Sequence, residues 1–231
     1  MSVALDGPRI PASGGRVKGL VVFLHGYGAD GGDLIELGRH WRALLPEIAF
    51  VSPHAPERCA GAPTGRQWFA LSNRPPHDPG SADDRWNGVV KARGPIDAFL
   101  DAELERLGLD DSRLALVGFS QGSMMAMHVG LRRRQAPAAI LSYSGLLVGP
   151  ERLKEATARD ARGAPAPVLL VHGDQDPLIP LDAMFMAAEA LAEAGIPAQW
   201  HISFGVAHGI DGGGLHHGGL FIAQALTGTA R

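Results

Sequence analysis

The sequence predicts an α/β fold in which helices cover both faces of a mostly parallel central sheet. Short, continuous apolar runs recur along the chain, as expected of strands that are buried on both faces. Longer amphipathic stretches lie between these runs, and this alternation is typical of a parallel sheet with covering helices. The length of 231 residues suits one α/β domain spanning 1–231.

The expected strands are short apolar runs bounded by glycine, proline or polar residues. The first, residues 19–24, reads GLVVFL. The others lie at 48–52, 114–117, 138–141, 168–171 and 199–204. No apolar run approaches the length needed to cross a bilayer, so we expect no membrane span.

The expected helices have apolar residues at helical spacing. In 96–107 these residues are Ile96, Phe99, Leu100, Leu104 and Leu107. Two further helices, 123–133 and 182–193, are rich in Ala, Met and Leu, and Gly195 and Pro197 end the second of them. A final apolar helix is expected at 220–226.

Two stretches read as irregular. Residues 56–88 are rich in Pro, Gly, Arg and Asp but contain the apolar residues Trp68, Phe69 and Leu71. A loop of this length is usually functional or mobile. It is either a lid-like insertion over a substrate pocket or a surface insertion with Trp68 in the core, and we favour the lid. Residues 212–219 are glycine-rich and are the second irregular stretch.

Charge and cysteine content exclude several classes of function. The net charge of −3 gives no field that would attract nucleic acid or anionic lipid. The basic cluster 132–134 is interpreted as the solvated end of a helix rather than a phosphate site. Cys59 is the only cysteine, so no intramolecular disulfide can form. Residues 1–15 lack the features of a signal peptide, and we expect a cytoplasmic protein.

Residues 118–122, GFSQG, match the motif G-x-S-x-G. The motif follows an expected strand and precedes an expected helix, which is the setting of a nucleophile elbow. Side chains two positions before and after Ser120 would collide with neighbouring backbone, so glycine is needed at both. Ser120 is therefore the candidate nucleophile, and the plain alternative is a glycine-rich turn with an ordinary serine.

A serine nucleophile needs a base, and His208 is the best candidate. It follows the strand-like segment 199–204 in a loop flanked by glycine, and it comes after the acids in the chain order that this kind of site requires. His201 lies within the strand-like segment. His216 and His217 are interpreted as loop residues, because no third metal ligand has sensible spacing. We therefore expect no metal.

The acid that orients the imidazole should follow the expected strand at 168–171. Asp174 and Asp176 both stand there, just before Pro177. One can hold the imidazole through Nδ1, and the other can cap the turn. The spacing alone does not separate them.

Residues 26–31, GYGADG, also match the dinucleotide motif G-x-G-x-x-G, which suggests an NAD-dependent oxidoreductase as a rival function. That site wants an acid at the end of the next strand, and 51–54 contain none. An oxyanion loop fits better, with the backbone amides of Tyr27 and Gln121 as the donors. A non-catalytic binding protein on this fold is the third hypothesis, and the complete Ser, Asp and His set argues against it.

Several segments together resemble the phospholipase/carboxylesterase family, which includes acyl-protein thioesterases. They are FLHGYG at 23–28, GFSQG at 118–122 with Met124 and Met125, LSYSGL at 141–146, HGDQDPLIP at 172–180 and AHGI at 207–210. The resemblance implies an α/β-hydrolase fold with a minimal cap and no cofactor. It selects Asp176 as the orienting acid.

The resemblance also implies the substrate class. It points to carboxylic esters or thioesters with short to medium acyl chains, sometimes lysophospholipids, and it suggests that Trp68 lines the acyl pocket. Met124, Leu146, Leu178 and Ile179 are further candidates for that pocket, with ordinary core packing as the alternative. The expected partner is a small ester or thioester, and a homodimer is left open.

Overall fold

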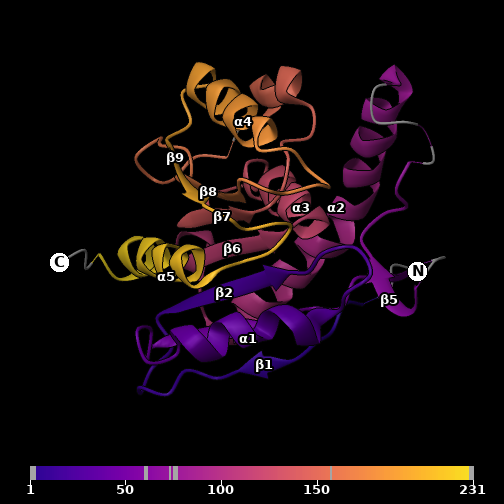
Figure 1. Ribbon diagram of the computed structural model, residues 1–231. Helices are drawn as coiled ribbons and strands as arrows, with labels where there is room; N and C mark the ends of the chain where they lie inside the picture. The colour runs from indigo at the N-terminus through magenta and orange to yellow at the C-terminus, as the bar shows by residue number, and fades with distance from the viewer. Residues whose placement is uncertain (1–3, 60–61, 73, 75–77, 157, 229–231) are drawn as a thin grey trace.

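The computed structural model describes residues 4–59, 62–72, 74, 78–156 and 158–228. Its centre is a seven-stranded sheet in the order β1-β3-β2-β6-β7-β8-β9 (Figure 1). The strands of this sheet are β1 (Arg9–Ile10), β2 (Gly19–Leu24), β3 (Ile48–Val51), β6 (Leu114–Phe119), β7 (Ala139–Tyr143), β8 (Val168–Gly173) and β9 (Ala198–Ser203). Only β1 is antiparallel to its neighbour among these strands, which confirms the mostly parallel sheet.

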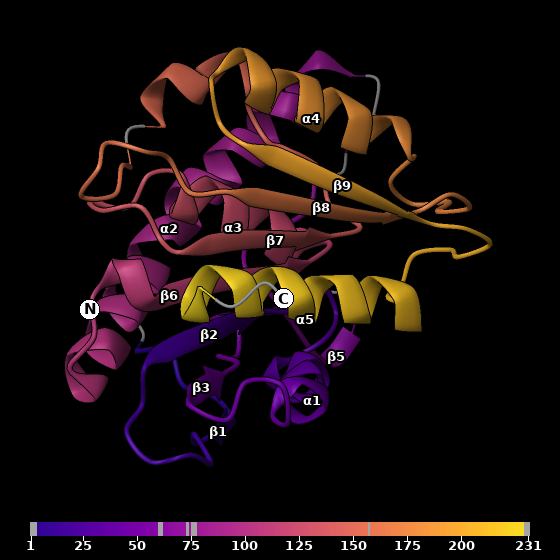
Figure 2. The same ribbon diagram turned by 90° about the vertical axis from the view of Figure 1, so that its left-hand side faces the viewer.

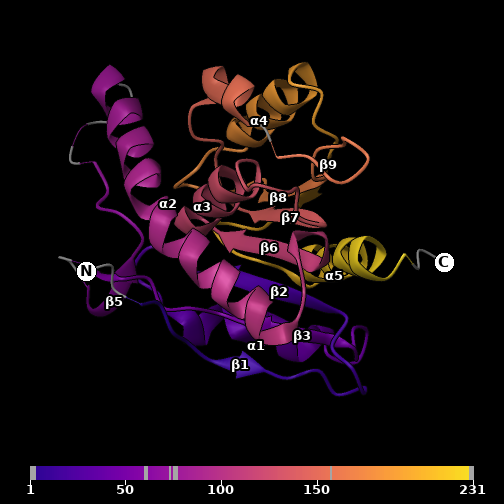
Figure 3. The same cartoon turned by 180° about the vertical axis from the view of Figure 1, so that it is seen from behind.

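Helices cover both faces of the sheet, as expected. They are α1 (Gly31–Trp41), α2 (Pro79–Leu107), α3 (Gln121–Gly130), α4 (Asp182–Glu193) and α5 (Gly212–Thr227), with short 3-10 helices at Asp111–Arg113 and Pro150–Glu155. The first and last of these helices, α1 and α5, pack on one face, while α2, α3 and α4 pack on the other (Figures 2 and 3). No helix in the described ranges is long and apolar enough to cross a membrane.

The strand β2 shows why the expected strands are apolar without alternation. Leu20 and Val22 belong to the core on the side of α2, α3 and α4. Val21 and Phe23 belong to the core on the side of α1 and α5. Because both faces are covered, every residue of the strand is buried and a continuous apolar run results.

The stretch 56–88 is more regular than the sequence suggests. It contains a hairpin of β4 (Glu57–Cys59) and β5 (Ala62–Gln67), and then the start of α2, which begins at Pro79 rather than Ile96. Asp78 caps this helix by accepting a hydrogen bond from the Gly80 amide. The expectation of an irregular insertion is therefore wrong for the hairpin and for the start of α2. Residues 60–61, 73 and 75–77 of the stretch lie outside the described residues.

The glycine-rich stretch 212–219 is helical, which corrects a second expectation. Asp211 caps α5 by accepting from the amides of Gly213 and Gly214. The glycines allow α5 to approach the sheet closely, since a Cβ at Gly218 would overlap the hydroxyl of Tyr143. Tertiary packing here outweighs the weak helix propensity of glycine.

The basic cluster 132–134 is not a solvated helix end, because Arg132 and Arg133 are both buried. The Arg133 guanidinium forms ion pairs with Asp97 at 3.0 Å, Asp101 at 2.6 Å and Asp111 at 2.8 Å. Arg133 thus connects the turn after α3 to α2 and to the short helix before β6. A buried cation needs such partners, and the sequence spacing did not reveal them.

The buried histidine of α3 makes stability depend on pH. His128 is 4% exposed, its ring packs edge-on against Trp86, and its Nδ1 has no partner among the described residues. Burial, with the nearby charges of Arg132 and Arg93, lowers the pKa of His128 to about 3. Below about pH 6.5, the ordinary pKa of histidine, His128 binds a proton in the unfolded chain but stays neutral in the folded protein. The free energy of unfolding therefore falls as the pH falls.

A His128→Phe variant should therefore be less sensitive to acid than wild type. Between pH 7.5 and pH 5 the wild type should lose about 2 kcal/mol more unfolding free energy than the variant, which keeps the aromatic contact but cannot titrate. Urea unfolding at both pH values measures this difference. Equal losses in the two proteins would show that His128 does not stay neutral in the folded state.

Candidate active site

Ser120 lies at a sharp turn between the end of β6 and the start of α3. Its φ is 54° and its ψ is −116°, a conformation that residues other than glycine rarely adopt. A Cβ at Gly118 would overlap the backbone of Gly122, and a Cβ at Gly122 would overlap the carbonyl oxygen of Leu24. The two glycines are thus required by close backbone packing, which holds Ser120 in its strained conformation.

His208 lies in the loop between β9 and α5, beside this turn. Its Nδ1 is 2.7 Å from Oδ2 of Asp176. Its ring packs against the ring of Phe119, the residue before Ser120, with 4.9 Å between the two ring centroids. No hydrogen bond joins the Ser120 hydroxyl to His208 among the interactions of the described residues. Such bonds often tighten only when substrate binds, so the arrangement is compatible with a nucleophile and its base.

Asp176 is held as a buried carboxylate. Its Oδ1 accepts from the amides of Leu178 at 2.9 Å and Ile179 at 3.0 Å. Burial acts to raise the pKa of Asp176, but the hydrogen bonds from these amides and from His208 outweigh it and lower the pKa below its usual value. The side chain is therefore ionised at neutral pH and fixed in orientation, as an acid that positions an imidazole must be.

Asp174 has a different position. It is exposed, and its Oδ1 accepts from the Gly205 amide at 2.6 Å. This contact ties the turn after β8 to the loop after β9. The structure thus brings Asp176, and not Asp174, to the imidazole of His208.

The loop after β2 is braced by His25, which is fully buried. Its Nε2 accepts from the Ala55 amide at 3.0 Å, so the proton of the neutral ring is on Nδ1, 2.8 Å from the carbonyl of Gly26. Burial lowers the pKa of His25, which keeps the ring neutral. The carbonyl of His25 in turn accepts from the indole N–H of Trp68 at 2.8 Å.

Tyr27 and Gln121 supply the two amides expected to hold an oxyanion. The neighbouring Gly28 amide is occupied, since it donates to the carbonyl of Arg66 at 3.0 Å. Within the described part of the chain, the backbone N–H groups of Tyr27 and Gln121 donate to no protein acceptor. Gln121 is the first residue of α3, where amides lack intrahelical partners and favour negative charge.

The side chain of Gln121 has a role that the motif did not indicate. Its Oε1 accepts from the Trp68 amide at 2.9 Å, and its Nε2 donates to the carbonyl of Phe69 at 2.8 Å. Gln121 therefore fastens the segment after β5 to the turn that carries Ser120. Such a long-range contact leaves no signal in the local sequence.

Ser144 is a second supporting residue that sequence reasoning missed. It is buried, has a positive φ of 46°, and donates from its hydroxyl to the carbonyl of Gly209 at 3.3 Å. Gly209 follows His208, so this contact holds the loop that carries the imidazole. A non-glycine residue with positive φ near a site is a recognised sign of function, but it is visible only in the structure.

The five residues expected to line an acyl pocket are placed differently from one another. Trp68, Met124 and Ile179 are buried. Leu146 lines a cavity of about 110 Å³ beside α2, and Leu178 is 70% exposed. Their role in binding an acyl chain stays a prediction.

Two other expectations concern bound groups. The amino end of α1, where a dinucleotide pyrophosphate would bind, is capped by the carboxylate of Asp30, which accepts from the Gly32 amide at 2.6 Å. His201 and His217 lie 4.3 Å apart between ring centroids, and His216 is next to His217. No group of three or more metal-ligating side chains is assembled among the residues that the structure describes.

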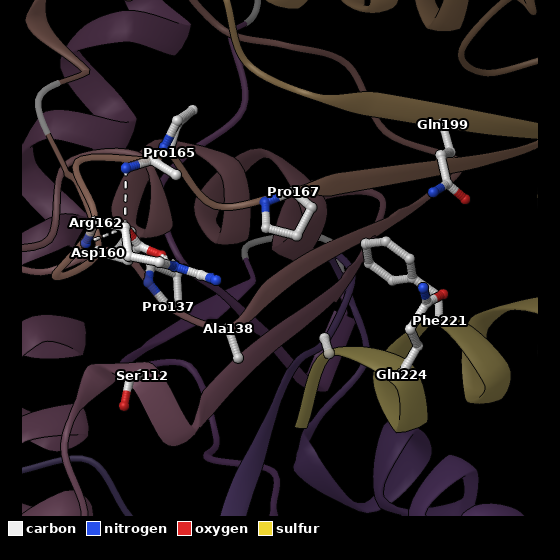
Figure 4. Close-up of a pocket in the computed structure, with 13 residues that line it drawn as sticks. Ser112, Pro137, Ala138, Asp160, Arg162, Pro165, Pro167, Gln199, Phe221 and Gln224 are labelled. Atoms are coloured by element: carbon white, nitrogen blue, oxygen red, sulfur yellow. Dashed lines mark hydrogen bonds and ion pairs between the residues drawn. The ribbon is translucent and has the colours of Figure 1, made fainter. Parts of the chain in front are cut away.

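A separate cavity of about 420 Å³ lies at the amino ends of β7 and β8 (Figure 4). Pro137, Pro167 and Phe221 are among the side chains around it. Ligands of open parallel sheets bind at the carboxyl ends of the strands, where Ser120 and Asp176 lie. This cavity is therefore at the wrong end of the sheet to belong to the same site.

Comparison with known proteins matches residues 5–225 to a model of the family described as phospholipase/carboxylesterase. Acyl-protein thioesterase 1 of Schizosaccharomyces pombe is 29% identical over 163 residues, which cover 69% of each chain. Acyl-protein thioesterase 1 of Gibberella zeae is 24% identical and covers 90% of this chain and 91% of its own.

A solved structure, that of esterase PE8, superposes with a TM-score of 0.89 at 42% sequence identity. The match covers 97% of this chain and all of the other (100%). The expected resemblance and the expected fold are thereby confirmed.

Proposed function

Since the chain belongs to the phospholipase/carboxylesterase family and is a serine hydrolase, we propose that it hydrolyses carboxylic esters or acyl thioesters with short to medium acyl chains. Ser120 is the proposed nucleophile, His208 its base and Asp176 the orienting acid. The observation that carries this proposal is the 2.7 Å contact between His208 Nδ1 and Asp176 Oδ2, beside the strained turn at Ser120.

In the first half of the proposed reaction, Ser120 Oγ attacks the carbonyl carbon while His208 Nε2 takes the hydroxyl proton. The carbonyl oxygen becomes an oxyanion and accepts from the amides of Tyr27 and Gln121. Each such donor typically lowers the barrier by about 3 kcal/mol. Asp176 stays ionised and stabilises the imidazolium, which agrees with its lowered pKa.

The bond to the alcohol or thiol then breaks, and His208 gives its proton to the leaving oxygen or sulfur, which completes the first half of the reaction. The acyl group stays on Ser120. Water then attacks the acyl-enzyme while His208 takes a proton from it, and His208 gives this proton to Ser120 Oγ as the bond to the acyl group breaks and the carboxylic acid leaves. The chemistry is the same for an ester and a thioester, so both substrates fit the site.

Steady-state hydrolysis of p-nitrophenyl esters from acetate to dodecanoate tests the proposal, beside a butyryl thioester. We expect kcat/KM of about 10⁴ M⁻¹s⁻¹ or more for the best ester, within the usual range for enzymes. We also expect the rate to decline towards the longest chains. Background rates for all esters and for the thioester would contradict the proposed activity.

A further inference from the structure

A cavity of about 420 Å³ lies between α1 and α5. These two helices cover one side of the sheet (Figure 2). Its wall is mostly apolar. Leu34 and Leu37 come from α1, Leu215 comes from α5, and Ile210 comes from the loop between β9 and α5. None of the five residues expected to form an acyl pocket lines it. The sequence therefore gave no indication of this cavity.

The cavity adjoins three parts of the proposed catalytic machinery, the oxyanion loop, the nucleophile turn and the loop of the base. Three of its lining residues are direct neighbours in sequence of that machinery: Gly26 precedes Tyr27, Phe119 precedes Ser120, and Gly209 follows His208. The Phe119 ring also packs against the His208 imidazole at 4.9 Å between centroids. The cavity thus lies beside residues that flank Tyr27, Ser120 and His208 in the chain.

The position beside His208 indicates which half of the substrate the cavity receives. The imidazole must give its proton to the leaving oxygen or sulfur, so that atom has to lie within hydrogen-bond reach of His208. The chain attached to the leaving atom then extends along the surroundings of His208, which are Phe119, Gly209 and Ile210. We propose that the cavity binds the alcohol or thiol part of the substrate, an inference that rests on the proposed hydrolase function.

The charges around the cavity narrow the class of leaving group. Asp33, Glu36 and Asp211 contribute carboxylates, and the other titratable residues of the lining are His25 and His40. Glu36 is paired with Arg39 at 2.9 Å, and Asp211 accepts from two amides at the start of α5, which leaves Asp33 as the main source of negative potential. A phosphate-bearing leaving group would be repelled by these carboxylates. The ligand class is therefore a primary alcohol or thiol that has an apolar chain and no anionic group.

Acetate esters of primary alkanols, from ethyl to hexyl, test this assignment, because the acyl group and the reactivity of the leaving alcohol stay nearly constant along the series. In wild type, kcat/KM should rise about fourfold for each methylene that enters the cavity, equivalent to about 0.8 kcal/mol of transfer free energy. Ethyl esters of acetate to hexanoate form the matched series in which only the acyl chain varies.

Leu215→Trp should fill the cavity, and Leu220→Trp is the matched control. Leu220 lies on the same helix, is 45% exposed and does not line the cavity. Leu215→Trp should lower the ratio of hexyl to ethyl acetate turnover at least tenfold, while Leu220→Trp leaves it near the wild-type value. Should the tryptophan prevent folding, Leu215→Ala enlarges the cavity instead and should move the optimum towards longer alkyl chains.

The outcomes separate the inference from the function on which it rests. An unchanged hexyl-to-ethyl ratio in both Leu215 variants would overturn the assignment, provided that wild type hydrolyses these acetates. The assignment would also be overturned if the Leu215 variants changed the relative rates only among the ethyl esters, because the cavity would then hold the acyl chain. If wild type hydrolyses no ester and its serine is not labelled by a fluorophosphonate, the proposed function itself fails.

Discussion

Replacing Ser120 by alanine should lower kcat for ester hydrolysis by at least about 10⁴-fold, because no other group can form the acyl-enzyme. The oxyanion donors remain in the variant, so a small residual rate above that in water is expected. The wild-type and variant kcat values for p-nitrophenyl butyrate give the size of the effect. A variant that retained more than about a hundredth of the wild-type kcat would contradict the assignment of the nucleophile.

The same replacement should leave the fold almost unchanged. Alanine adopts the positive φ of this position at a cost similar to that of serine, and the flanking glycines are untouched. The Ser120 hydroxyl forms no hydrogen bond with any described residue, so its loss removes no internal contact. The thermal midpoint of the variant should therefore lie close to that of wild type, which separates loss of chemistry from loss of structure.

Replacing Asp176 by asparagine should lower kcat by about 10³- to 10⁴-fold. An amide at this position no longer stabilises the imidazolium, and it can hold His208 in the wrong tautomer. The amides of Leu178 and Ile179 would still find an acceptor in the asparagine oxygen, so the turn should persist. Steady-state kinetics at pH 7.5 measure the effect.

Asp174→Asn is the matched control for this prediction. The residue stands two positions away and accepts from the Gly205 amide, a contact that asparagine can keep. Its kcat should stay within about threefold of wild type, as is usual for an exposed substitution. A large loss in Asp174→Asn with little change in Asp176→Asn would exchange the roles of the two acids.

The sheet could be predicted from sequence because the burial of each strand is visible in the strand's own residues. Strands covered on both faces must be apolar throughout, so each appears as an uninterrupted run, as at β2, β6 and β8. The helix α4 was predicted with its observed bounds, since its residues have high helix propensity and glycine and proline follow it. The elbow could be predicted because its two glycines are required by steric overlap.

The starts of α2 and α5 could not be predicted, because both contain glycines that tertiary packing selects. A Cβ at Gly88 would overlap the Phe69 ring, and a Cβ at Gly218 would overlap Tyr143. Glycine at such positions weakens the helical signal in the sequence while it permits the helix to pack closely. Local propensity and the final structure therefore disagree where two elements approach most closely.

The site shows the same division between local and long-range information. Ser120 and His208 stand in recognisable local settings, at a strand–turn–helix junction and in a loop after a strand. The choice of Asp176 over Asp174 needs the direction of each side chain, which the spacing does not give. The bracing contacts of Gln121 and Ser144 and the cavity beside His208 join residues far apart in sequence, so only the folded chain reveals them.

The most direct test of the proposed active site is covalent labelling with a fluorophosphonate, followed by mass spectrometry of the digested protein. The proposed site predicts one phosphonyl adduct per chain, located on Ser120, in wild type and no adduct in Ser120→Ala. An adduct at another serine, or no adduct in folded and ester-hydrolysing wild type, would contradict Ser120 as the nucleophile.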